Sequence, residues 1–233
     1  LTEKRIKAVV GITPVNIGRL FREGFSQYDP LGALAAMAAQ RTKEARGGEN
    51  NSGASSGPDE IRKKLYPLKK GNGSYRIVDL GNLNPGHDLD ETYVRVSEVC
   101  RMLLENNVLP IILGGTHDLD YGQYSGYETM SKLVSLLNID AFLDLEDKKD
   151  APANQQHIHK ILLHEPNYLF SYTHLAYQSY LIDASHTAVL EKLYFEAFRI
   201  GQMRSSLQEM EPVIRNADML SFDITAIRSS DAP

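Results

Sequence analysis

The amino-acid sequence predicts an α/β fold in which a mostly parallel β-sheet carries helices on both faces. Short apolar runs typical of strands alternate with amphipathic runs typical of helices from residue 58 to residue 224. Strands joined by helical crossovers run parallel, because each crossover returns the chain to the same end of the sheet. The chain has 233 residues, of which 42% are hydrophobic and 24% charged, and this excludes a disordered or collagen-like protein.

The first expected helix begins near Pro58, after a Gly-, Ser- and Asn-rich loop over residues 47–57. Proline suits the first helical turn because its missing N–H is not needed there, and Asp59 and Glu60 complement the positive end of the helix dipole. Apolar spacing then predicts the elements that follow. They are a strand over residues 75–80, a helix over 92–106, a strand over 108–113, a helix over 129–137 and a strand over 139–145.

The same alternation continues in the second half of the chain. We expect a helix over residues 155–164, a strand over 175–182, helices over 188–198 and 207–216, and a strand over 219–224. No internal repeat interrupts this order, and strand patterns occur on both sides of the loop at residues 47–57. The sequence therefore predicts a single domain over residues 1–233.

Charge and cysteine usage restrict the partners. The chain has 25 Lys and Arg against 30 Asp and Glu, a net charge of −5, so the basic surface typical of proteins that bind nucleic acid or anionic membranes is not expected. A small-molecule substrate is the expected partner. The single Cys100 lies in an amphipathic run and is expected to be buried and inert, which suits a reducing, cytoplasmic location. No apolar run approaches the roughly 18–20 residues of a membrane span.

Polar side chains follow three of the expected strands. His117 comes after two glycines that let the chain turn sharply, Asp140 and Asp144 lie in the expected strand 139–145, and Asp223 and Thr225 close the last strand. Alternation along a strand predicts that Asp140 and Asp144 share one face. The carboxyl ends of parallel strands form the ligand-binding edge of such sheets, so these side chains are expected to converge.

Carboxylates brought together in a cleft repel one another, and a divalent cation relieves the repulsion. Oxygen ligands with one imidazole favour Mn²⁺, while Zn²⁺, Fe²⁺ and Co²⁺ remain alternatives. Each segment taken singly also fits an ordinary cap or turn. A nucleotide-binding domain is a weaker alternative, because neither G-x-G-x-x-G nor a P-loop follows any expected strand.

Taken in order, the motifs resemble those of the ureohydrolase family of arginases, agmatinases and formimidoylglutamases. The matching segments are GGTH at residues 114–117, DAFLD at 140–144, SFDIT at 221–225, GASSGPDEIR at 53–62 and IGQMR at 200–204. The resemblance covers residues 47–233. It implies a three-layer α/β/α sandwich with a binuclear manganese centre that hydrolyses non-peptide C–N bonds in guanidino or formimino compounds.

The resemblance also implies which residues bind metal. The ligands of one ion are retained in full and match His117, Asp140, Asp144 and Asp223. Both ligands that belong to the second ion alone are replaced, by Phe142 and Thr225. We therefore expect one Mn²⁺ ion, the Phe142 ring in the vacated space, and weak or absent hydrolase activity. The rival hypothesis is a catalytically inactive protein that keeps the fold as a binding or scaffold module.

His157 is the one candidate for a catalytic proton shuttle. It lies 13 residues after Asp144, a spacing similar to that of a shuttle histidine in arginases, although the residues around it instead suggest the start of a helix with His157 facing solvent. The substrate is left open between formiminoglutamate, arginine and agmatine. The resemblance further implies a homo-oligomer, and a family domain that continues beyond Pro233 with another strand and helices.

Overall fold

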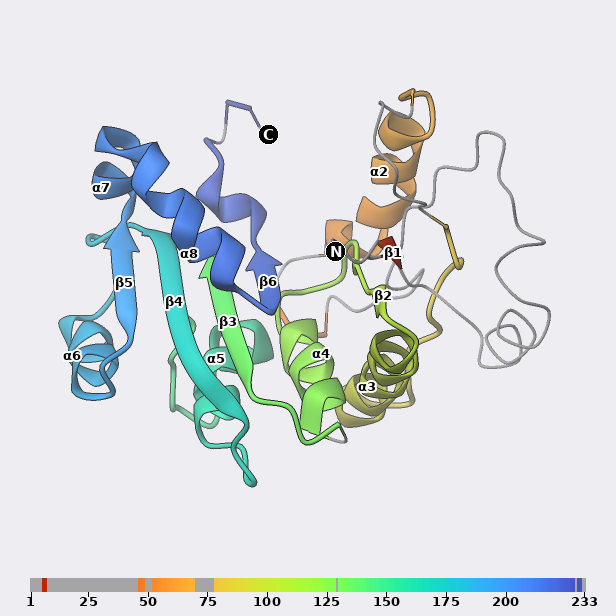
Figure 1. Ribbon diagram of the computed structural model, residues 1–233, viewed down its shortest axis with the longest axis horizontal. Coiled ribbons are helices and arrows are strands. Elements are labelled where there is room, and N and C mark those ends of the chain that lie inside the picture. The colour runs from red at the N-terminus through yellow and green to blue at the C-terminus, as the bar shows by residue number, and fades with distance from the viewer. Residues whose placement is uncertain are drawn as a thin grey trace, which may run out of the picture. The chain divides into compact units, whose positions relative to one another are not determined.

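A computed structural model describes residues 6–7, 46–48, 52–69, 78–128, 130–228 and 230–231. The chain forms two compact units, residues 1–130 and residues 131–233 (Figure 1). Part of the expected strand 75–80 lies outside the described residues, as does the middle of the expected loop 47–57.

The described residues of the first unit are largely helical. Its elements are β1 (Ile6–Lys7), η1 (Ser52–Ser55), α2 (Gly57–Leu65), α3 (Leu89–Glu105), β2 (Val108–Leu109) and α4 (Leu119–Glu128). The short strands β1 and β2 pair in parallel. The apolar face of α3 forms the core of the unit, with Val96, Val99, Cys100 and Leu103 buried. Burial raises the pKa of the Cys100 thiol to about 12, so the prediction of a buried, inert cysteine is confirmed.

Helix α4 was not expected from the sequence. Its residues LDYGQYSGYE include two glycines, which are poor helix formers, and they lack a clear apolar stripe. Packing explains the helix: a Cβ on Gly122 would lie 3.0 Å from the Cα and carbonyl oxygen of Tyr93. Glycine therefore lets α4 approach the backbone of α3 closely, and this tertiary contact outweighs the weak local propensity.

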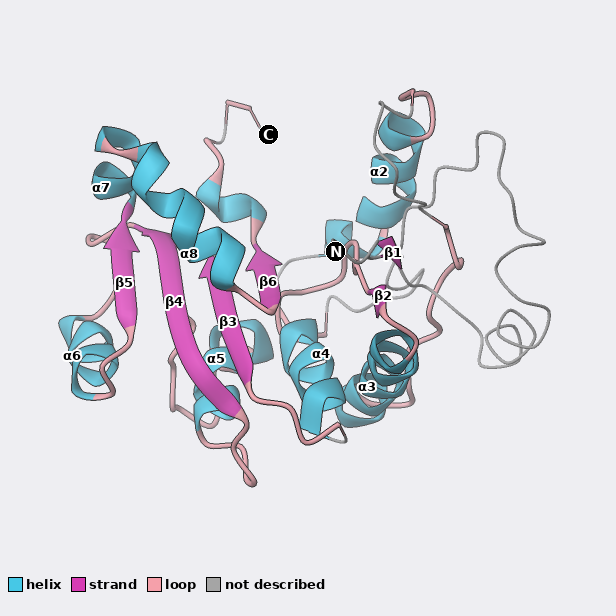
Figure 2. Ribbon diagram, in the orientation of Figure 1, coloured by secondary structure: helices cyan, strands magenta, loops and turns pink. Residues whose placement is uncertain are grey.

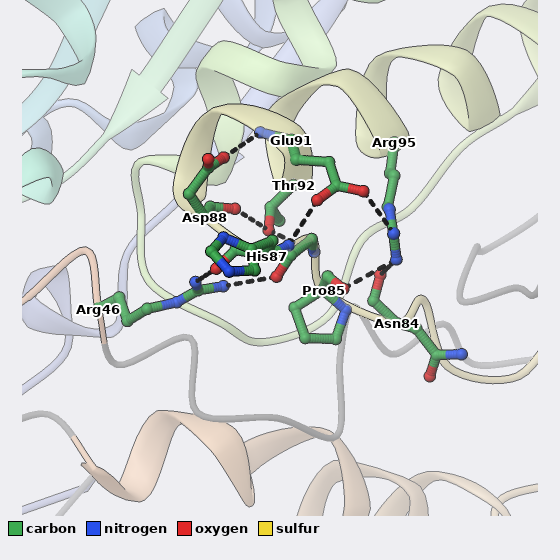
Figure 3. Close-up of polar contacts among 9 residues, drawn as sticks. Arg46, Asn84, Pro85, His87, Asp88, Glu91, Thr92 and Arg95 are labelled. Atoms are coloured by element: carbon green, nitrogen blue, oxygen red, sulfur yellow. Dashed lines mark hydrogen bonds and ion pairs between the residues drawn. The ribbon is translucent and has the colours of Figure 1, made fainter.

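The start of α3 is fixed by a network of polar contacts (Figure 3). The Asp88 carboxylate accepts a hydrogen bond from the Glu91 amide at 2.8 Å, and the Glu91 carboxylate accepts one from the His87 amide at 2.6 Å. Asp88 is therefore the N-cap of α3, and Glu91 in its first turn holds the residue that precedes the cap. The hydrogen bond from the His87 amide lowers the pKa of Glu91. Arg46 donates to the His87 carbonyl at 2.8 Å, which attaches residues 46–48 to the helix start.

Arg62 ties α2 to the chain that follows it. Its Nε and Nη2 atoms lie 2.9 and 3.1 Å from the two carboxylate oxygens of Asp79, and its Nη1 lies 2.6 Å from the Asn82 side-chain oxygen. A planar guanidinium matches a carboxylate in this two-point geometry. The last residue of the GASSGPDEIR segment thus has a structural role.

The second unit is built on a parallel four-stranded sheet (Figure 2). The strand order is β5 (Glu196–Arg199), β4 (Leu169–Tyr177), β3 (Val134–Ile139) and β6 (Met219–Phe222). The other elements are η2 (Ala153–Gln155), α5 (His157–Leu162), α6 (Ala184–Lys192), α7 (Ile200–Ser205), η3 (Leu207–Glu209), α8 (Met210–Asn216) and η4 (Ile224–Ala226). In Figure 1, α8 covers the front of the sheet and α5 lies behind it. Buried Leu137, Leu175 and Met210 pack between α8 and the sheet.

The expected helix 129–137 is wrong, because residues 134–139 form β3, the second strand of the sheet from its β6 edge. Its apolar side chains are buried on both faces, so no alternation distinguishes this run from a helix. The sequence-based strand 139–145 was consequently placed too late. The expected helix 188–198 also extends into β5, whereas the expected helix 207–216 and strand 219–224 agree with α8 and β6 within a few residues.

Among the described residues, no helix combines the length and the apolar character that crossing a bilayer requires.

Candidate metal centre

In the first unit, the candidate ligand His117 stands between a glycine turn and a helix. Gly114 and Gly115 both have φ of +82°, and α4 begins two residues after His117. The His117 Nε2 lies 3.2 Å from the Asp120 carboxylate, and both side chains are largely buried. Sequence reasoning missed Asp120. Its spacing of three residues from His117 was the local signal, but it gave no reason to pair the two side chains because helix α4 was not expected.

Gly114→Ala should destabilise this turn. The left-handed conformation is unfavourable for alanine, and the new Cβ would lie 2.6 Å from the Pro58 ring. We expect a loss of about 1–3 kcal/mol in the free energy of unfolding, measured by urea denaturation. Gly57→Ala is the matched control, because a Cβ there has nothing within 4 Å. Equal stability of the two variants would contradict this account of the turn.

In the second unit, Asp140 and Asp144 form a close carboxylate pair. The residues are 2% and 8% exposed, and a carboxylate oxygen of one lies within 4.8 Å of a carboxylate oxygen of the other. The prediction that they share a strand face is wrong, because β3 ends at Ile139. A loop brings them together instead, with Asp144 at φ +51°. Two buried carboxylates at this separation favour either a proton on one of them or a cation between them.

Thr225 joins the DAFLD and SFDIT segments. Its hydroxyl donates to Asp140 Oδ1 at 2.5 Å, and its amide donates to Asp223 Oδ1 at 2.7 Å. The Phe142 amide donates to the same Asp140 oxygen at 3.0 Å. Since the Asp223 amide also bonds the Ile139 carbonyl at 2.9 Å, Asp140 and Asp223 follow neighbouring strands side by side. One Asp140 oxygen therefore accepts two hydrogen bonds from protein groups.

Phe142 stands at the position of one lost ligand of the second ion. The residue is 40% exposed within the described chain. A phenyl ring offers no lone pair to a metal, so the residue cannot replace a histidine ligand. The expectation that the ring occupies the vacated position stays a prediction.

His157 is fully buried at the first residue of α5. The interpretation of His157 as a solvent-facing helix residue is therefore wrong. Its Nδ1 lies 2.9 Å from the Asn154 carbonyl oxygen and 3.8 Å from Asp144 Oδ2. A carbonyl only accepts hydrogen bonds, so Nδ1 carries the proton, and Nε2 is the acceptor in the neutral ring.

The four predicted ligands divide between the units. His117 belongs to residues 1–130, whereas Asp140, Asp144 and Asp223 belong to residues 131–233. In the second unit, Asp140 and Asp144 lie in the loop after β3, and Asp223 directly follows β6. Carboxylate oxygens are suitable ligands for a hard or borderline divalent cation. The complete four-ligand set stays a prediction.

Comparison with known proteins decides the family. The model of the Arginase family matches residues 42–233. The chain belongs to the arginase family. This arginase-family chain is 24% identical over 227 residues to a formimidoylglutamase of Geobacillus sp. (strain WCH70), covering 92% of the chain and 69% of that protein. It spans only 30% of the formimidoylglutamase of Streptococcus gordonii, to which it is 33% identical over 98 residues.

Solved structures of the family share the fold. The formimidoylglutamase of Bacillus subtilis aligns with a TM-score of 0.72 at 19% identity, covering 86% of this chain and 68% of that one. A formiminoglutamase of Trypanosoma cruzi, solved with Mn²⁺, aligns with a TM-score of 0.70 at 18% identity, covering 83% and 69%. The predicted three-layer α/β/α sandwich with a parallel sheet is thus confirmed.

Proposed function

We propose that this arginase-family chain is a metal-dependent hydrolase that cleaves a non-peptide C–N bond in a linear amidine. The observation that carries the proposal is the buried Asp140–Asp144 pair beside Asp223, because these carboxylates follow the strand ends where the family motifs lie. Formiminoglutamate is the first candidate substrate, since the relatives named above are formimidoylglutamases. Arginine and agmatine are the alternatives.

We further propose that a single Mn²⁺ is held by His117, Asp140, Asp144 and Asp223. When bound, a divalent ion lowers the pKa of a coordinated water and so supplies a hydroxide nucleophile at neutral pH. The protein residues hold the carboxylates in place: the Thr225 hydroxyl and the Phe142 amide fix one Asp140 oxygen. Both donors belong to the residues that replace the ligands of the second ion. Because their hydrogen bonds take up this Asp140 oxygen, the arrangement supports one ion rather than two.

His157 suits the role of a proton acceptor. Its Nδ1 proton is directed to the Asn154 carbonyl at 2.9 Å, which leaves the lone pair on Nε2. The nearby Asp144 carboxylate, 3.8 Å from Nδ1, stabilises the ring when it becomes positively charged. We propose that His157 moves protons during hydrolysis.

The expectations of a cytoplasmic homo-oligomer and of a domain that extends beyond residue 233 stay predictions.

Product release tests the hydrolase proposal. We expect slow Mn²⁺-dependent release of formamide from N-formimino-L-glutamate and less urea from arginine or agmatine. Chelation should abolish the activity, and Asp223→Asn should abolish it without restoration by excess Mn²⁺. Asp231→Asn, the same change at an exposed residue, is the matched control and should keep full activity.

The second candidate function is an inactive binding or scaffold protein, which the replacement of both second-ion ligands favours. Absence of product from all three substrates at every Mn²⁺ concentration would support this candidate and contradict the hydrolase. Product release that persists unchanged in Asp223→Asn would also contradict the proposed site, because the activity would then arise elsewhere.

A further inference from the structure

Two fully buried polar side chains lie beneath the candidate metal centre, on β4. Tyr172 and His174 are two residues apart and therefore share one face of the sheet. His174, which is 0% exposed, pairs in register with Asn138 of β3, two residues before Asp140. No local pattern distinguishes His174 from the other histidines among the seven of the chain.

Hydrogen bonds link these side chains to the main chain of Asp140. The His174 Nε2 lies 3.0 Å from the Asp140 carbonyl oxygen, and its Nδ1 lies 2.9 Å from the Tyr172 hydroxyl. A carbonyl only accepts, so Nε2 carries the proton and donates. In the neutral ring Nδ1 is then the acceptor, and the Tyr172 hydroxyl donates to it. The direction of the chain is fixed: Tyr172 to His174 to Asp140.

This chain acts where Asp140 leaves the sheet. The Asp140 amide still bonds the Leu175 carbonyl of β4 at 3.1 Å, but β3 ends at Ile139. The carbonyl of Asp140 is bound by the His174 imidazole and not by a backbone amide of a neighbouring strand. The Asp140 carboxylate, in turn, accepts from the Phe142 amide and the Thr225 hydroxyl. Main chain and side chain of Asp140 are therefore restrained by separate groups.

We propose that His174 is a positioning residue for Asp140 and that Tyr172 fixes the tautomer in which His174 donates. The inference rests on the proposed function in one respect, that Asp140 is a metal ligand. Loss of a partner that orients a metal ligand typically weakens metal binding by about 10–100-fold. Because His174 acts through the main chain, we expect about a 10-fold loss, at the lower end of that range.

Three variants separate positioning from general stability. His174→Leu removes the donor and leaves the buried Tyr172 hydroxyl without its acceptor. His174→Gln is the conservative variant, because its side-chain amide can reach the Asp140 carbonyl. Met210→Ala is the destabilised control: its side chain is buried against Leu137 and Leu175 in the core beneath α8.

The first readout is Mn²⁺ affinity by isothermal titration calorimetry. We expect affinity about 10-fold weaker in His174→Leu, largely restored in His174→Gln and unchanged in Met210→Ala. Wild-type affinity in His174→Leu would overturn the proposal. Equal losses in His174→Leu and Met210→Ala would overturn it as well, since the effect would then be one of stability.

The second readout needs no metal and separates this inference from the proposed function. Hydrogen exchange of the Phe142 amide reports the position of the Asp140 carboxylate that it contacts. In the metal-free protein we expect faster exchange at Phe142 in His174→Leu and recovery in His174→Gln. If wild-type protein binds no Mn²⁺, the proposed metal site fails, and this exchange pattern alone decides the positioning role; unchanged exchange in His174→Leu would overturn it.

Discussion

The double variant Phe142→His with Thr225→Asp is expected to raise the Mn²⁺ content from about one to about two ions per chain. It supplies an imidazole and a carboxylate at the two positions where the family resemblance places ligands of the second ion. It also removes the hydrogen bond from the Thr225 hydroxyl to Asp140 Oδ1, so that the backbone amide of residue 142 remains as a donor and the oxygen becomes more accessible to a cation. Metal content is measured by mass spectrometry after reconstitution and desalting.

Stability provides an independent check on the double variant. Thr225→Asp places another carboxylate beside Asp140, so the metal-free variant should unfold at a lower temperature than wild type. Because a ligand that binds only the folded state stabilises it, added Mn²⁺ should raise the unfolding temperature more in the double variant. Each single variant is a control and should not gain a full second ion. An unchanged metal count in the double variant would mean that Phe142 and Thr225 are misassigned.

Asp140→Asn is expected to remove both metal binding and hydrolysis. The substitution keeps the size of the side chain but removes the charge, and a neutral amide is a weak ligand for Mn²⁺. Losing about 4 kcal/mol of stabilisation in the transition state corresponds to a decrease of about 10³-fold in kcat/KM.

The Asp140→Asn measurement is formamide release from N-formimino-L-glutamate, together with metal content. Folding is checked by circular dichroism, since Asp140 is buried and accepts hydrogen bonds from Phe142 and Thr225. Asp231→Asn again serves as the control. A folded Asp140→Asn protein that keeps its metal and its activity would exclude Asp140 as a ligand.

The edge of the sheet that carries the candidate ligands could be predicted from the sequence more accurately than the bounds of the strands. The segments that carry Asp140 and Asp223 were expected at the carboxyl ends of two strands, with both residues inside the strands; both residues instead directly follow the neighbouring strands β3 and β6. This succeeded because parallel strands present their carboxyl ends at one edge, whatever their exact bounds. The bounds of β3 were missed because its side chains are buried on both faces, which hides the alternation.

Contacts distant in sequence were beyond prediction. The His174 side chain meets the Asp140 carbonyl across 34 residues, and the Thr225 hydroxyl meets the Asp140 carboxylate across 85. Neither pair carries a local spacing signal. Helix α4 was missed for a related reason, since its glycines favour close packing on α3 and disfavour a helix locally.

The number of Mn²⁺ ions bound by the wild-type chain distinguishes a centre with one ion from a centre with two ions and from a chain that binds none. The protein is stripped with chelator, reconstituted with excess Mn²⁺, desalted, and analysed for manganese and protein in the same sample. We expect about one tightly bound Mn²⁺ per chain, held by His117 and the three aspartates. Two tightly bound ions would contradict the loss of the second site at Phe142 and Thr225, and none would contradict the metal centre altogether.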